Sequence, residues 1–243
     1  MTRLIEAADY ADLSRKACDF VVTALRKNPA SVCIFPTGET PLGLFRELVA
    51  ARKDGAFDAS AMRAVTLDEY AAIARDDRRR LFLWLRRELL DPLGIPDRRI
   101  DAFEPSASDP QAEAARMERR VAELGGIDLA VLGLGANGHL GFNEPGSAFD
   151  SRTRPVTLAA DSIRSNAAYW GSEADVPRQA LTLGIGNLLE AREILVLASG
   201  AHKSAILTQA LGGPVTTDLP ATALRSHPAA TFIADRAALS LRA

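Results

Sequence analysis

Short apolar, β-branched runs alternate with longer amphipathic segments along almost the whole chain. The clearest runs are Ser31–Phe35, Ala64–Leu67, Ile127–Leu132 and Ile194–Ala198. Runs of this length that lie between helical patterns are typical of strands in a parallel sheet. The alternation therefore predicts an α/β fold, with an open, mostly parallel, Rossmann-like sheet and helices on both of its faces.

The remaining elements follow from the same periodicity. We expect helices over Leu4–Lys27, from Pro41 to about Arg52, over Asp77–Leu90, over Ala112–Leu124 and over Ser162–Trp170, and further strands at Pro155–Leu158, Leu181–Leu183 and Thr231–Ala234. Thr40 is a residue type that caps helices, and Pro41 suits a first helical position. No linker, low-complexity tract or repeat interrupts the pattern, so residues 1–243 are expected to form one domain.

Composition argues against several classes of protein. A net charge of -2 gives no electrostatic case for binding nucleic acid or an acidic membrane. No apolar run approaches the roughly 20 residues that span a bilayer, and the segment Met1–Tyr10 carries Glu6 and Asp9 where a signal peptide would be apolar. Because only Cys18 and Cys33 occur, we expect no disulfide scaffold and a cytoplasmic protein.

Four polar clusters each follow a predicted strand directly. They are Thr37-Gly38, Asp68, Asn137-Gly138-His139 and Gly200–Lys203. The carboxyl ends of parallel strands meet at one edge of the sheet, where the active sites of open α/β folds form. We therefore expect all four clusters to contribute to one site.

The segment Val131–Gly146 is the most informative motif. An apolar run ends in closely spaced glycines, and His139 and Glu144 follow. Glycines permit tight turns, and a histidine with a carboxylate just past a strand end is suited to proton transfer. The glycine spacing also matches the dinucleotide fingerprint, and Asp161 lies at about the distance of a ribose contact. Glycines and a proline interrupt the helix which that fingerprint requires, so nucleotide binding is the weaker interpretation.

A phosphate site is predicted at the strand-to-helix loop Thr37-Gly38-Glu39-Thr40-Pro41. Free backbone N–H groups and the helix dipole favour an anion there, although an ordinary capped turn explains the local sequence equally well. The Glu39 side chain would have to point away from a phosphate. Lys203 follows another strand at a helix start, where the dipole disfavours a cation, and this makes it a candidate phosphate ligand.

Acidic residues directly after the second predicted strand have two interpretations each, and a run of charged residues follows them. Asp68 is either a catalytic carboxylate or a turn residue, and Glu69 is either its partner or solvated. Arg75–Arg80 holds four arginines and two aspartates, which we interpret as a solvated helix start with internal ion pairs. We identify no spacing of histidines or cysteines that indicates a metal site.

The combination of motifs resembles the glucosamine-6-phosphate deaminase family, including its galactosamine-6-phosphate deaminase/isomerase branch. The resemblance covers about Ser31 to Ala234 and rests on Pro-Thr-Gly-x-Thr-Pro, Leu-Asp-Glu-Tyr, Gly-x-Asn-Gly-His-Leu-Gly-Phe-Asn-Glu-Pro-Gly and Gly-Ala-His-Lys. It implies conversion of an amino-hexose 6-phosphate, glucosamine 6-phosphate in the first place, to a fructose 6-phosphate-type ketose and ammonia. No organic cofactor is implied.

The resemblance also implies roles for the residues of the acid–base site. Asp68 would move a proton between C2 and C1 of the sugar, His139 would assist opening of the pyranose ring, and Glu144 would orient His139. Some relatives carry aspartate where this chain has Asn137. We therefore expect a histidine–glutamate dyad in place of a triad.

For the phosphate, the resemblance implies contacts to the backbone of Gly38, Glu39 and Thr40, with Lys203 as counter-charge. Relatives commonly add an arginine at the position that corresponds to Ala168. Arg164 lies four residues earlier on the same helical face and is the expected substitute. The irregular segment 150–177 is expected to act as a lid.

Three other functions stay open at this point. They are a galactosamine-6-phosphate deaminase/isomerase, a 6-phosphogluconolactonase of the same fold that would not need Asp68 as a base, and a non-catalytic sugar-phosphate sensor. The sensor is disfavoured because we find no helix-turn-helix segment and no basic patch. Because the chain ends soon after its last predicted strand, we expect a monomer or a small homo-oligomer without allosteric control.

Overall fold

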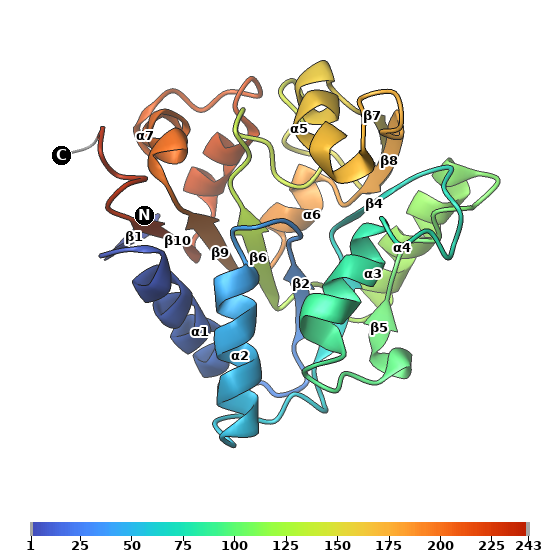
Figure 1. The fold of residues 1–243 in the computed structure, drawn as a ribbon. Coiled ribbons are helices and arrows are strands. Elements are labelled where there is room, and N and C mark those ends of the chain that lie inside the picture. Colours follow the sequence, from blue (N-terminus) through green and yellow to red (C-terminus); the bar gives the residue numbers. More distant parts are fainter. Residues whose placement is uncertain (1, 242–243) are drawn as a thin grey trace.

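The computed structural model describes residues 2–241 and contains two sheets (Figure 1). The larger sheet has seven strands in the order β1-β10-β9-β6-β2-β3-β5, and every neighbouring pair is parallel. Its strands are β1 (Arg3–Ala7), β2 (Val32–Phe35), β3 (Arg63–Thr66), β5 (Ile100–Asp101), β6 (Leu129–Gly133), β9 (Glu193–Ala198) and β10 (Ala230–Asp235). The predicted open, parallel α/β sheet is thereby confirmed.

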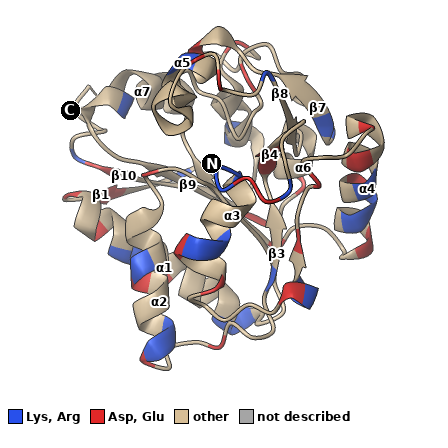
Figure 2. Cartoon of the chain, turned by 45° about the vertical axis from the view of Figure 1, so that its right-hand side comes forward, with Lys and Arg blue, Asp and Glu red and all other residues tan. Residues whose placement is uncertain are grey.

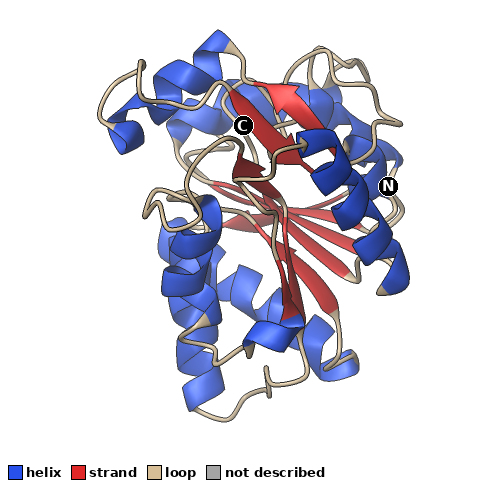
Figure 3. Ribbon diagram, turned by 90° about the vertical axis from the view of Figure 1, so that its right-hand side faces the viewer, coloured by secondary structure: helices blue, strands red, loops and turns tan. Residues whose placement is uncertain are grey.

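Helices cover both faces of this sheet, as the edge-on view in Figure 3 shows. The α-helices of the described residues are α1 (Tyr10–Lys27), α2 (Leu42–Lys53), α3 (Leu81–Leu85, continued by a π-helical turn over Arg86–Leu90), α4 (Pro110–Glu123), α5 (Ala160–Trp170), α6 (Ile185–Leu189) and α7 (Ser204–Gly212). Two separate apolar clusters fill the space between the sheet and its two helical layers. Acidic and basic residues are interspersed along α4 (Figure 2). None of the helices described is both long and apolar enough to cross a membrane.

The second sheet is small and antiparallel, and the sequence did not indicate it. It has the order β4-β8-β7, formed by β4 (Asp68–Tyr70), β8 (Gln179–Thr182) and β7 (Arg154–Thr157). The chain leaves the large sheet at Leu67 and pairs Asp68 with Thr182 immediately afterwards. Together with α5, the small sheet lies beyond the carboxyl ends of the large one (Figure 1). The expected strand at Leu181–Leu183 therefore belongs to β8 and not to the parallel sheet.

The expected helix over Leu4–Lys27 is wrong in its first part. Residues Arg3–Ala7 form β1, which pairs with β10 at the edge of the sheet, and α1 begins only at Tyr10. Asp9 sets that start, because its carboxylate accepts a hydrogen bond from the N–H of Asp12 at 2.8 Å. An exposed edge strand has no apolar alternation strong enough to distinguish it from the amphipathic helix that follows.

Two expected helix starts also need correction. Pro41 precedes α2 as its cap residue, and no side chain, Thr40 included, caps that helix. The helix expected from Asp77 begins at Leu81, because the carboxylate of Glu69 accepts hydrogen bonds from the first backbone N–H groups of α3. The expected helices over Ala112–Leu124 and Ser162–Trp170 are confirmed as α4 and α5.

Candidate active site

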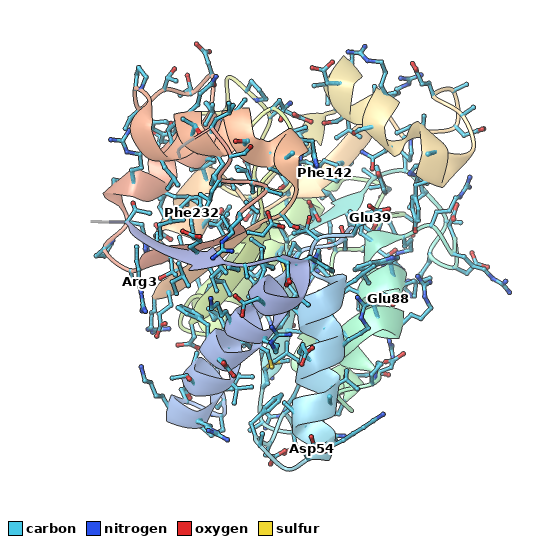
Figure 4. The ribbon with its side chains drawn as sticks, turned by 60° about the vertical axis from the view of Figure 1, so that its left-hand side comes forward. Arg3, Glu39, Asp54, Glu88, Phe142 and Phe232 are labelled. Atoms are coloured by element: carbon cyan, nitrogen blue, oxygen red, sulfur yellow. The ribbon has the colours of Figure 1, made fainter. Side chains whose placement is uncertain are left out.

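A cavity of about 310 Å³ lies between the carboxyl edge of the large sheet and the small sheet. Residues that follow β2, β3, β6 and β9 line it, namely Thr37, Gly38, Glu39, Thr40, Asp68, His139 and Lys203. Two of the residues that line the cavity, Glu39 and Phe142, are labelled in Figure 4. Both lie far from Asp54, which follows the opposite end of α2. At least one residue of each of the four polar clusters thus borders the same cavity.

The loop before α2 offers unused backbone donors to this cavity. Gly38 has a positive φ of 103°, which a residue with a side chain adopts only under strain. The hydroxyl of Tyr10 lies 3.2 Å and 3.1 Å from the carbonyl oxygens of Glu39 and Thr40 and so braces the loop. Within residues 2–241, no hydrogen bond engages the backbone N–H groups of Gly38, Glu39 or Thr40. The loop can therefore bind an anion, and the Glu39 side chain is exposed to solvent.

Asp68 is a buried carboxyl group at the start of β4. Burial, helped by the negative charge of Glu69, raises the pKa of Asp68 to about 7. No protein donor among the described residues hydrogen-bonds to its carboxylate. Gly141 makes room for it, since a Cβ at that position would lie 3.2 Å from Asp68 Oδ2. These conditions favour a carboxylate that accepts a proton near neutral pH.

Glu69 is neither a catalytic partner of Asp68 nor solvated. Its side chain is fully buried and pairs with Arg80, whose Nε lies 3.1 Å from Glu69 Oε2. Arg80 is buried as well and donates to the carbonyl oxygen of Phe103 at 3.2 Å. The interpretation of Arg75–Arg80 as a wholly solvated helix start is therefore wrong at Arg80, although Arg79 does pair with Asp77 as expected.

His139 and Glu144 form the expected pair, with 3.6 Å between His139 Nδ1 and Glu144 Oε2. Asn137 connects them in a way that the sequence did not indicate. Its side-chain Nδ2 donates to Glu144 Oε2 at 3.0 Å, and its Oδ1 accepts the backbone N–H of His139 at 3.1 Å. Neither Asn137 nor Glu144 lines the cavity, so both act from behind His139.

The Glu144 carboxylate is ionised despite its partial burial. Burial alone would raise its pKa, but the contacts from His139, Ser162 and Asn137 outweigh that effect and bring the pKa of Glu144 below its ordinary value.

A glycine before this pair makes room for the histidine ring. A Cβ at Gly135 would lie 2.3 Å from Cδ2 of the His139 ring, so the ring can occupy its place only next to a glycine.

Lys203 is the one lysine or arginine among the described residues that line the cavity. It ends a short 3₁₀ turn, Ala201–Lys203, that follows β9. Burial lowers the pKa of its amine, and no carboxylate of residues 2–241 forms an ion pair with it. The carboxylate of Asp235 accepts hydrogen bonds from the hydroxyl of Ser199 and the N–H of Gly200, and so holds the turn in place. Sequence reasoning did not identify this brace.

Arg164 does not reach the cavity. It pairs with Asp161 on the exposed face of α5, which also leaves Asp161 unavailable as the ribose ligand of a dinucleotide site. The same helix instead presents three smaller polar side chains to the cavity, those of Ser162, Ser165 and Asn166. Their spacing of three and four residues is the sequence signal that identifies one helical face.

The dinucleotide interpretation of the glycine motif is not supported by the backbone. The described chain between β6 and β7 contains no helix, so the glycines lead into a turn. That turn is closed by hydrogen bonds from Gly138 N to Gly135 O at 3.0 Å and from Gly135 N to His139 O at 3.1 Å.

Comparisons with known proteins identify the family to which the chain is similar. The family model for glucosamine-6-phosphate isomerases and 6-phosphogluconolactonase matches residues 7–233. The chain is 40% identical over 239 residues to the glucosamine-6-phosphate deaminase of Geobacillus sp. (strain WCH70), covering 98% of this chain and 95% of that protein. A solved monomeric glucosamine-6-phosphate deaminase superposes with a TM-score of 0.96 at 35% identity, covering 99% of this chain and 100% of that chain. The 6-phosphogluconolactonase of Trypanosoma cruzi superposes with a TM-score of 0.76 at 21% identity, covering 99% and 96%, and this match shows the fold alone.

Proposed function

This chain belongs to the family of glucosamine-6-phosphate isomerases and 6-phosphogluconolactonases, and we propose that it is a deaminating isomerase of that family. It converts glucosamine 6-phosphate and water to fructose 6-phosphate and ammonia. The observation that carries this function is one cavity bordered by a buried carboxyl group with a pKa of about 7, by a histidine that a glutamate backs from outside the cavity, and by a lysine.

Ring opening is the task of His139. Opening the pyranose requires a proton to leave the anomeric hydroxyl and a proton to reach the ring oxygen. The imidazole borders the cavity and is backed by the Glu144 carboxylate, so it can carry that proton in either direction. Asn137 and Glu144 orient the ring and do not touch the sugar.

The isomerisation is the task of Asp68. In the open-chain sugar, Asp68 removes the hydrogen from C2, and the electron pair forms a C1–C2 double bond while the C1–O double bond opens. The C1 oxygen takes up a proton from the C2 ammonium group, so that an enolamine forms. The same carboxyl group then returns a proton to C1, which leaves an iminium group at C2. One water molecule held in the closed cavity adds to that carbon and ammonia departs, so that the ketone forms. A base with a pKa near neutrality suits both the removal and the return of the proton.

The phosphate binds at the loop Thr37–Thr40. The free N–H groups of the loop point to an anion site, and Lys203 supplies the counter-charge from the other side of the cavity. Ser165 and Asn166 are the further polar groups on α5 within this cavity, in the place where an additional cation was expected. The whole chain forms one domain, and the segment 150–177 acts as the lid that keeps water from the open-chain intermediate.

The protein is proposed to act as a cytoplasmic monomer. A solved glucosamine-6-phosphate deaminase that superposes with a TM-score of 0.96 is described as monomeric. Both cysteines are buried and unpaired, as in proteins of reducing compartments.

A substrate panel tests the function. The purified protein is incubated separately with glucosamine 6-phosphate, galactosamine 6-phosphate and 6-phosphogluconolactone, and ammonia, ketose phosphate and lactone hydrolysis are measured. We expect the highest kcat/KM, with ammonia release, for glucosamine 6-phosphate. Preference for the galacto epimer would change the substrate and keep the reaction, whereas lactone hydrolysis without ammonia release would overturn the proposal.

The pH dependence is expected to follow Asp68. Because the carboxyl group must be ionised to remove the C2 proton and its pKa is about 7, kcat/KM should fall about tenfold per pH unit below that value. The rate is measured in buffers from about pH 5 to 9 at constant ionic strength, with substrate well below KM. A rate that stays constant down to about pH 5.5 would contradict the role of Asp68 as the base.

Lys203→Met is expected to weaken phosphate binding. The variant removes the cation from the cavity and keeps the length of the aliphatic chain, so KM should rise roughly 10- to 100-fold while kcat changes less. Steady-state kinetics on glucosamine 6-phosphate give both constants. Lys27→Met, at an exposed position on α1, is the matched control. An unchanged KM would place the phosphate elsewhere.

A further inference from the structure

Ser162 joins the lid segment to the acid–base pair. It lies in the first turn of α5, its residue is 3% exposed, and its hydroxyl donates a hydrogen bond to Glu144 Oε1. The other carboxylate oxygen, Oε2, receives the Asn137 side chain and faces His139 Nδ1. Glu144 is therefore held at both oxygens, from the loop after β6 on one side and from α5 on the other.

These two hydrogen bonds fix the orientation of the Glu144 carboxylate. With a donor on each oxygen, the carboxylate plane cannot rotate about its terminal bond without breaking one hydrogen bond. His139 Nδ1 is buried and has no hydrogen-bond partner in residues 2–241, and Glu144 Oε2 is the carboxylate oxygen that lies 3.6 Å from it. The orientation of the imidazole thus depends on a carboxylate whose position depends on Ser162.

The position of Ser162 is itself set by the packing of α5. The adjacent Ile163 and the final residue of the helix, Trp170, are buried in an apolar cluster with Tyr70 and Phe142. Tyr70 and Trp170 pack edge to face with ring centroids 5.0 Å apart. Because Tyr70 belongs to the same short strand as Asp68, this cluster ties α5 to the element that carries the proposed base.

We propose that Ser162 is a positioning residue of the deaminase reaction, which acts on His139 through Glu144 and makes ring opening dependent on the packed position of α5. This inference rests on the function proposed above. The competing possibility is a direct contact between Ser162 and the sugar, since Ser162 also borders the cavity. A positioning role affects kcat and depends on Glu144, whereas a direct contact with the sugar affects KM and does not depend on Glu144.

The kinetic test compares Ser162→Ala, Ser162→Thr, Glu144→Gln and the Ser162→Ala/Glu144→Gln double variant. A hydrogen bond to a charged group is lost in Ser162→Ala, so kcat should fall about 10- to 100-fold with KM within about twofold of the wild type. Threonine keeps the hydroxyl and should restore most of kcat. In the Glu144→Gln background, Ser162→Ala should change kcat by less than about twofold, because the group through which it acts has been altered. Ser172→Ala, at an exposed residue just after α5, is the matched control.

A second measurement does not depend on activity. The carboxyl ¹³C resonance of Glu144 is titrated by NMR in the wild type and in the three Ser162 and Ser172 variants. Loss of the hydroxyl donor should move the Glu144 titration to higher pH in Ser162→Ala alone. If the wild type released no ammonia, the proposed function would fail, and this titration would still decide whether Ser162 holds Glu144. A rise in KM at constant kcat, effects of Ser162→Ala and Glu144→Gln that multiply, or an unmoved titration would each overturn the inference.

Discussion

Replacing Asp68 by asparagine is expected to lower kcat by roughly 10²- to 10⁴-fold, the contribution of a well-placed general base. The amide has nearly the same shape as the carboxyl group but cannot accept the C2 proton. The site is otherwise unchanged by the substitution, because no protein donor among the described residues binds the Asp68 carboxylate. KM should therefore change much less than kcat. Initial rates of ammonia release at saturating substrate measure the effect.

The control for this variant is Asp76→Asn, at an exposed position in the loop before α3. It should leave kcat unchanged, and both variants should retain the circular dichroism spectrum of the wild type. Asp68→Asn removes a buried carboxyl group that is costly to ionise, so no loss of stability is expected from it. If Asp68→Asn kept more than about a tenth of the wild-type kcat, Asp68 would not be the base.

Arg80→Met is expected to have the largest effect on stability. It leaves the fully buried Glu69 carboxylate without its cation, and breaking such a pair on one side costs about 3–5 kcal/mol of unfolding free energy. Backbone donors from Leu81 and Phe82 and from Tyr70 remain, but they carry no full charge. Urea unfolding followed by circular dichroism at neutral pH measures the difference.

Arg78→Met is the matched control for Arg80→Met. Arg78 is exposed and lies two residues before the buried arginine, so its substitution should change the unfolding free energy by less than about 0.5 kcal/mol. A loss of less than about 1 kcal/mol in Arg80→Met would mean that Glu69 is protonated or solvated in the folded protein. Because burial raises the pKa of Glu69 despite the arginine, the measurement at neutral pH is repeated at alkaline pH, where the carboxyl group is ionised.

Local sequence patterns were sufficient to predict the large sheet and the residues at its carboxyl edge. β2, β3, β6 and β9 are short, mostly apolar runs bounded by turn residues, and parallel pairing brings polar residues after them into one cavity. The prediction of Asp68, His139 and Lys203 as neighbours needed only this topological rule. The resemblance to a known family then gave each residue a chemical role.

Features that depend on contacts between distant segments could not be predicted in this way. β1 forms only because β10 lies beside it, and its own sequence continues smoothly into the helical pattern of α1. The pairing of Asp68 with Thr182 that creates the small sheet joins residues more than a hundred positions apart. The burial of Glu69 could not be predicted because its partner, Arg80, lies in a run of charged residues that gives no sign of burial.

In the candidate site, too, the features that depend on contacts between distant segments could not be predicted from the sequence. The sequence placed Arg164 on the cavity side of α5, but the helix is rotated by the burial of Ile163 and Trp170, so that Ser162, Ser165 and Asn166 face the cavity. Charge and periodicity alone do not fix that rotation. The contribution of Ser162 became visible only with the hydrogen bond to Glu144, which lies in a different segment of the chain.

The central claim is that this protein replaces the C2 amine of glucosamine 6-phosphate by a ketone. The most direct measurement follows the substrate labelled with ¹³C at C2 by NMR while ammonia is assayed in the same sample. The account predicts that the amine-bearing C2 resonance disappears as the C2 resonance of fructose 6-phosphate appears, with one ammonia released per ketose, and that Asp68→Asn shows neither change on the same timescale. A C2 resonance that stays amine-bearing in the presence of the folded wild-type protein would contradict the account.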